Sequence, residues 1–195
     1  GAPGAFERTS NRHDYAVKPP EPTVLNALKE AGFISLAIGK INDIFSGEGV
    51  TDARKTKNNA EGVKRTLEAI KSDHEPGLIF TNLVDFDSKY GHRRDPEGYA
   101  EALRQFDKRV PDLMEACRPD DLLIITADHG NDPTHHGTDH TREYVPLLVW
   151  SPQMKSGGGS LGVRSTFSDL AATIADNFKL AKPKNGVSFL SELVR

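Results

Sequence analysis

Cysteine, long apolar runs and an excess of positive charge are all missing from this chain of 195 residues. A single cysteine, Cys117, excludes an intrachain disulfide and favours a reducing, cytoplasmic setting. No apolar run approaches the roughly 20 residues that span a bilayer, so we predict no membrane segment. The formal net charge of −3 lacks the basic character of a general nucleic-acid binder, so we predict no nucleic-acid partner.

The chain begins without a methionine and without a signal peptide, and on that ground we expect a fragment or a processed product. Residues 1–22 are polar and punctuated by proline, which disfavours helix. We therefore predict an extended connector over 1–22 and the main structural unit over 23–195.

Apolar runs alternate with amphipathic segments after residue 22, which is typical of an α/β fold. Thr23 is predicted to cap the first helix, which ends at Gly32. Further helices are predicted at 59–72, 96–117, 166–178 and 188–194, and strands at 33–38, 77–84, 121–126 and 145–150. This alternation predicts a mainly parallel sheet with helices on both faces, whose sites form beyond the carboxyl ends of the strands.

Three clusters of acidic and imidazole side chains lie close to the predicted strands, namely 87–92 (DSKYGH), 128–130 (DHG) and 137–142 (GTDHTR). Two divalent ions about 3.5–4 Å apart can clamp the oxygens of a phosphoryl group in transfer. Carboxylates neutralise such ions, and imidazoles suit Mn and Zn better than Mg or Ca. An isolated Asp-His pair, however, is more often a cap or a loop anchor. From the residues alone, a metal site and a set of polar turns both stay open.

Other reactive side chains are assigned plainer roles. His135 and His136 are predicted to be exposed to solvent in a loop. Cys117 ends a predicted helix on its apolar face, which favours a buried structural thiol over a nucleophile. For Arg93 and Arg94 two interpretations stand: both cover the surface, or one of them pairs with a carboxylate of the site.

The motifs taken together resemble phosphopentomutases, a family of the alkaline phosphatase superfamily. The segments are 8–15 (RTSNRHDY), 39–49 (GKINDIFSGEG), 82–95 (NLVDFDSKYGHRRD), 126–133 (TADHGNDP) and 137–143 (GTDHTRE). The last motif separates this family from cofactor-independent phosphoglycerate mutases and sulfatases. The resemblance covers essentially the whole chain. It implies an alkaline phosphatase-like core, incomplete here, with residues 1–22 at the end of a cap insertion.

The resemblance implies two bound Mn²⁺ ions. By similarity, the ligands are Asp87, His92 and His140 for one ion, with Asp128 and His129 contributing to the other. Asp85 competes with Asp87 in the first cluster, and Asp87 is preferred because the motif places the ligand nearer the Gly91-His92 pair.

The implied reaction exchanges phosphate between the 1 and 5 positions of ribose or deoxyribose, through a phosphothreonine and a sugar bisphosphate. Pentose phosphates and a sugar bisphosphate activator are therefore the expected small-molecule partners. Arg8, Arg12 and Lys40 fall in segments that lie near the sugar phosphate in this family. Cationic side chains suit that role, although a surface charge is the alternative for each.

No threonine here stands in a motif that matches the family's nucleophile. In the family, that threonine, a further metal-binding aspartate and most of the cap come from the N-terminal part of a longer chain. We therefore assign no catalytic residue and expect this chain alone to be inactive, with that N-terminal part a candidate partner. A related phosphatase, a phosphoglycerate mutase and a non-catalytic metal-binding fragment are the alternatives.

Overall fold

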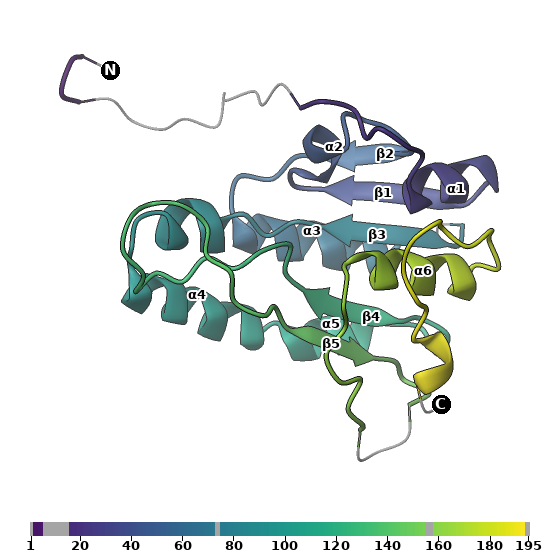
Figure 1. Ribbon diagram of the computed structural model, residues 1–195. Coiled ribbons are helices and arrows are strands. Elements are labelled where there is room, and N and C mark those ends of the chain that lie inside the picture. The colour runs from purple at the N-terminus through teal and green to yellow at the C-terminus, as the bar shows by residue number, and fades with distance from the viewer. Residues whose placement is uncertain (1, 6–15, 73–74, 155–157, 194–195) are drawn as a thin grey trace.

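Five strands organise the computed structural model, which describes residues 2–5, 16–72, 75–154 and 158–193. Strands β1 (Ile34–Ile38), β2 (Asp52–Arg54) and β3 (Gly77–Thr81) form a parallel sheet in the order β2-β1-β3 (Figure 1). Strands β4 (Leu123–Thr126) and β5 (Leu147–Trp150) form a separate antiparallel pair. The α/β class and the parallel sheet flanked by helices are confirmed.

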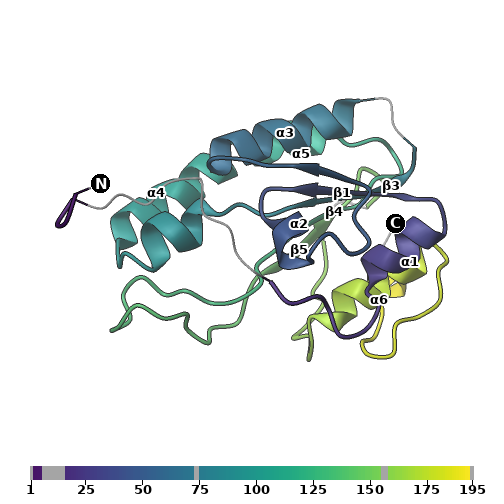
Figure 2. The ribbon, with the colours of Figure 1, turned by 90° about the horizontal axis from the view of Figure 1, so that it is seen from above.

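Helices lie on both sides of the strands. Figure 2 shows α3 and α5 on one side and α1 and α6 on the other. The helices are α1 (Val24–Glu30), α2 (Ile41–Ile44), α3 (Asn59–Lys71), α4 (Pro96–Asp107), α5 (Val110–Ala116) and α6 (Ser168–Asn177). A π-helical turn, η1 (Phe86–Gly91), and a 3₁₀ turn, η2 (Leu190–Glu192), complete the described elements.

The predicted first helix and first strand are confirmed, and local signals explain both. Thr23 and Asn26 form a reciprocal capping box at the start of α1, which satisfies backbone donors that the helix leaves unpaired. The apolar run of β1 becomes the centre of the parallel sheet, and its Leu36 and Ile38 pack against Ala69 of α3. A continuous apolar run is the pattern of a strand buried on both faces.

The single helix predicted over 96–117 is wrong, because it is two helices, α4 and α5, with a break between Asp107 and Val110. Pro111 supplies the physical reason. In a continuous helix its ring would clash with the carbonyl of Asp107 four residues earlier, and it has no N–H to donate. Pro111 is instead accommodated in the first turn of α5, where a free N–H is not needed.

Two other expectations need correction. No helix separates β4 from β5, so the chain returns through a loop and the two strands pair antiparallel rather than parallel. The predicted helix over 188–194 is only the short turn η2 within the described residues. Among those same residues, no helix combines the length and apolar character needed to cross a membrane.

Candidate metal centre

The acidic and histidine residues come from two segments, the turn η1 that follows β3 and the long loop that follows β4 (Figure 1). An isolated antiparallel bridge joins Gly130 to Thr141, whose N–H donates to the Gly130 carbonyl at 3.1 Å. This bridge brings two parts of one long loop together. As a result, the rings of His129 and His140 stack with their centroids 3.7 Å apart.

The π-helical turn explains the spacing of Asp87 and His92. The N–H of His92 donates to the Asp87 carbonyl at 3.0 Å, an i to i+5 bond. In an α-helix, residues five apart are offset by about 140° around the axis. The wider π turn reduces this offset, and His92 Nε2 lies 3.2 Å from Asp87 Oδ1.

Asp87 lies at the centre of the cluster. Its Oδ1 is 3.1 Å from His140 Nε2, and ligand atoms of Asp87, His129 and His140 all lie within 4.8 Å of one another. Atoms that bind one first-row metal ion at about 2.1 Å lie at most about 4.2 Å apart. The three ligand atoms therefore lie near the spacing that a common ion requires.

The hydrogen bonds of His92 are compatible with a cation beside Asp87. Its Nδ1 lies within hydrogen-bond distance of the Thr138 carbonyl, which can only accept, so Nδ1 carries the hydrogen. In the neutral ring, Nε2 then presents a lone pair to the carboxylate of Asp87. Two acceptors face each other favourably only with a proton or a metal ion between them. One carboxylate with several imidazoles is also a donor set that first-row transition metals accept.

Comparison with protein families gives a match to the Metalloenzyme superfamily over residues 4–182. This chain belongs to the Metalloenzyme superfamily. Membership supports a metal-dependent enzyme of the phosphotransferase and mutase type, with a divalent metal centre. The side chains gathered around Asp87 fit such a centre in this member of the superfamily.

The burial and hydrogen bonds of Asp85 differ from those of Asp87. Asp85 is 7% exposed, and its Oδ2 accepts the N–H of Asn59 at 2.9 Å, while its own N–H donates to Asn59 Oδ1 at 2.8 Å. The ammonium of Lys89 lies 3.1 Å from Asp85 Oδ1 as an ion pair. Asp85 thus fastens the segment after β3 to the start of α3. Asp85 Oδ1 has no hydrogen-bond partner among the described residues, and the choice of Asp87 as the ligand stays a prediction.

Replacing Asp85 with alanine is expected to lower the free energy of unfolding by about 1–3 kcal/mol, because the partly buried backbone N–H of Asn59 loses its acceptor. The Kd for Mn²⁺ is expected to stay within about threefold of the parent value in the folded variant. Urea denaturation and calorimetric titration with Mn²⁺ measure the two quantities. A large loss of Mn²⁺ affinity without a loss of stability would instead make Asp85 a ligand.

The remaining predicted site residues are less closely gathered. Asp128 is exposed, and its Oδ2 lies 3.6 Å from His129 Nε2, outside the three-residue group around Asp87. Lys40 directly follows Gly39 beyond the carboxyl end of β1, at the same edge of the sheet as the turn η1 that carries Asp87. Arg8 and Arg12 lie outside the described residues. The division of ligands between two ions stays a prediction.

Sequence reasoning missed Asn131 altogether. Asn131 is 7% exposed, and its Nδ2 donates to Asp87 Oδ1 at 2.7 Å. The close approach of Gly91 makes room for it, since a Cβ on that glycine would lie 2.4 Å from Asn131 Nδ2. Its position directly after Asp128-His129-Gly130 was the available signal. A side chain that hydrogen-bonds a ligating carboxylate fixes the orientation of that ligand.

Burial, nearby carboxylates and hydrogen bonds shift the pKa values of two side chains near the cluster. Burial raises the pKa of the Tyr99 hydroxyl on α4, and the carboxylates of Asp87 and Glu143 raise it further. The hydroxyl and N–H of Thr134 hold the pKa of Asp132 below its usual value. The hydroxyl of Thr141 makes two hydrogen bonds: it donates to the carboxylate of Glu143 and accepts the N–H of Asp132.

The structure agrees with the roles predicted for His135, His136 and Cys117. His135 and His136 are exposed, with ring centroids 4.1 Å apart, and they stay outside the group around Asp87. Cys117 is partly buried, and burial followed by the nearby Asp121 raises the pKa of its thiol. A raised pKa disfavours the reactive thiolate, which supports the structural role predicted for this residue.

Proposed function

We propose that this chain carries the metal centre of a phosphopentomutase, a cytoplasmic enzyme of pentose and nucleoside metabolism. The enzyme would interconvert ribose or deoxyribose 1-phosphate and 5-phosphate, with two Mn²⁺ ions as cofactors. The observation that carries the proposal is the meeting of His140, from the GTDHTRE motif, with Asp87 and His129 from the other two motifs. The Metalloenzyme superfamily match supports the coarser part of the assignment.

Each group in the proposed centre has a chemical role. Asp87, His92 and His140 hold one cation, and Asp128 and His129 contribute to the second. Bound divalent cations neutralise the charge that develops on a phosphoryl group in transfer. Asn131 keeps the carboxylate of Asp87 turned toward the imidazoles through its 2.7 Å hydrogen bond. Lys40, Arg8 and Arg12 are the proposed partners of the sugar phosphate, because cationic donors bind phosphate oxygens strongly.

A mutase assay on the gene product that carries these residues tests the proposal. With Mn²⁺ and a sugar bisphosphate activator, ribose 1-phosphate is expected to be converted to ribose 5-phosphate without net release of inorganic phosphate. Conversion of phosphoglycerate, with no turnover of ribose phosphates, would assign a phosphoglycerate mutase instead. Stoichiometric release of phosphate would assign a phosphatase. Either outcome would contradict the proposed activity while leaving the metal centre in place.

A further inference from the structure

Arg94 makes an unusual set of contacts for a side chain on this partly exposed loop. Its guanidinium makes five hydrogen-bond contacts, three of them shared by the two hydrogens of Nη1, and four of the acceptors are backbone carbonyls. The acceptors are the carbonyls of Gly91, Asp132, Gly137 and Asp139 and the Oδ1 of Asn131. Apart from Gly91, all lie on the loop that carries His140. Arg94 therefore links the end of the Asp87-His92 turn to that loop.

The backbone of Arg94 is also held in a rare conformation. Its φ of +54° lies in the left-handed region, which L residues with a Cβ seldom occupy. Such conformations persist where surrounding contacts fix them, and they concentrate at functional sites. Here the sharp turn after His92 directs the guanidinium to the carbonyls of the facing loop.

Two chains of contacts lead from Arg94 to the predicted ligands. In the first, Arg94 Nη1 donates to Asn131 Oδ1 at 3.1 Å, which leaves the amide Nδ2 to donate to Asp87 Oδ1. Because a guanidinium can only donate, this contact fixes which end of the carboxamide faces Asp87.

In the second chain, Arg94 holds the carbonyls of Gly137 and Asp139, on either side of Thr138. The carbonyl of Thr138 accepts the hydrogen of His92 Nδ1 and so keeps the Nε2 of His92 directed at Asp87. Asp139 directly precedes His140. The same guanidinium thus sets the orientation of His92 and the position of the segment that delivers His140.

We propose that Arg94 is a positioning residue of the metal centre, which holds Asn131 and the 137–140 segment so that the ligands converge before metal arrives. This inference rests on the proposed metal-dependent function. It concerns a residue that has no ligand atom of its own. Arginine suits the task because its planar fork offers five donors, whereas the lysine ammonium is a point charge with three.

The variant Arg94→Lys tests this role, with Arg93→Lys as the matched control. Arg93 is the exposed neighbour with the same charge. Titration of the purified chain with Mn²⁺, followed by electron paramagnetic resonance, is expected to show about 10–100-fold weaker binding for Arg94→Lys. The control is expected to bind within about twofold of the parent chain, since exposed substitutions away from such contacts have small effects.

The visible absorption of bound Co²⁺ separates positioning from a merely structural role. A positioning role predicts altered Co²⁺ bands in Arg94→Lys at metal concentrations that saturate the site, because the ligands no longer converge in the same geometry. Unchanged bands and an unchanged Kd, with or without a lower urea midpoint, would overturn the inference. Absence of Mn²⁺ binding by the parent chain would overturn the proposed metal centre, and this inference with it.

A second variant keeps the test decisive if Arg94→Lys does not fold. Asn131→Ala removes only the link from Arg94 to Asp87 and leaves the four carbonyl contacts of Arg94 in place. Mn²⁺ binding is expected to weaken about tenfold, at the lower end of the range for side chains that orient a ligand. An unchanged Kd for this variant would overturn the first chain of contacts.

Discussion

Asp87→Ala is expected to weaken Mn²⁺ binding by more than about 100-fold, the largest effect of any single change on the metal centre. Asp87 Oδ1 is the shared partner of His92, His140 and Asn131, at 3.2, 3.1 and 2.7 Å respectively. Asp87 is also the one carboxylate in the three-residue group found among the described residues. Without it, imidazoles alone face a dication whose charge nothing in the group neutralises.

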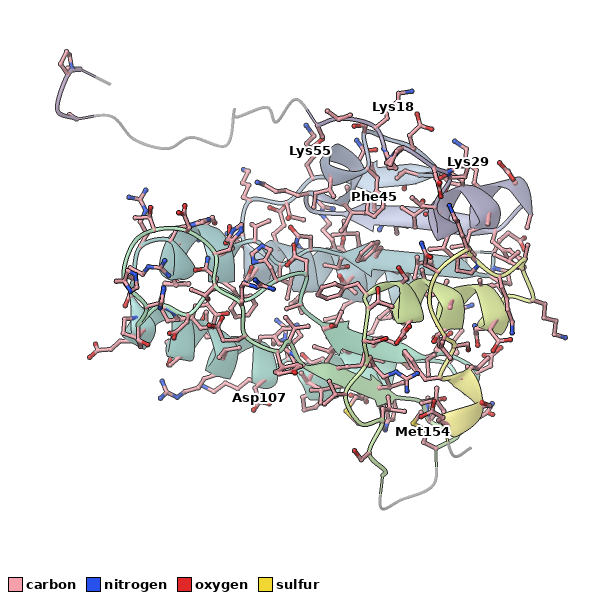
Figure 3. All side chains as sticks on the ribbon, in the orientation of Figure 1. Lys18, Lys29, Phe45, Lys55, Asp107 and Met154 are labelled. Atoms are coloured by element: carbon pink, nitrogen blue, oxygen red, sulfur yellow. The ribbon has the colours of Figure 1, made fainter. Side chains whose placement is uncertain are left out.

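Calorimetric titration and thermal unfolding with and without Mn²⁺ measure this loss. A ligand that binds only the folded state stabilises it by about 2.7 kcal/mol at 100 times its Kd. The parent chain is therefore expected to gain stability with Mn²⁺, and Asp87→Ala to gain almost none. Asp107→Ala is the control, since Asp107 ends α4 as an exposed carboxylate outside the Asp87 group (Figure 3). Equal Mn²⁺ stabilisation of both variants would contradict the assignment of Asp87.

Gly130→Ala is expected to damage stability and metal affinity together. A Cβ at this position would lie 2.8 Å from the Thr141 carbonyl and 2.9 Å from the Glu143 nitrogen, both of them backbone atoms. Relief of this contact has to shift backbone at or next to the bridge between Gly130 and Thr141. We expect a loss of about 1–3 kcal/mol of unfolding free energy, as for other overpacked sites. Mn²⁺ binding is expected to weaken about tenfold or more, because His140 then shifts away from His129.

Gly159→Ala provides the control for the glycine substitution. A Cβ at Gly159 would meet no atom within 4 Å, so its unfolding free energy is expected to change by less than about 0.5 kcal/mol. Urea denaturation and Mn²⁺ titration apply to both variants. If Gly130→Ala matches Gly159→Ala in both measurements, the bridge does not hold the centre together.

Elements with strong local signals could be predicted from the sequence. The cap at Thr23, the apolar run of β1 and the periodicity of α3 each depend on neighbouring residues, and each is confirmed. The three-residue strand β2 could not be predicted, because its exposed Asp52 and Ala53 carry no apolar pattern. Its pairing with β1 is a tertiary contact, and strand propensity depends on such context.

The sequence singles out the proposed ligands of the candidate site, but not the side chains that contact them. The motifs around Asp87, His129 and His140 stand out because acidic and imidazole side chains follow predicted strands. Arg94 and Asn131 do not stand out, since their partners lie far away in the chain. Arg94 contacts a carbonyl 43 positions later, and Asn131 contacts a carboxylate 44 positions earlier. Only the fold brings these partners together.

A crystal structure of the chain soaked with Mn²⁺, with anomalous difference maps recorded at the manganese edge, tests the central claim most directly. The predicted result is an anomalous peak within coordination distance of Asp87, His92 and His140. A second peak is predicted beside Asp128 and His129. Manganese bound only elsewhere on the chain, with the Asp87 cluster empty at saturating Mn²⁺, would contradict the metal centre proposed for these loops.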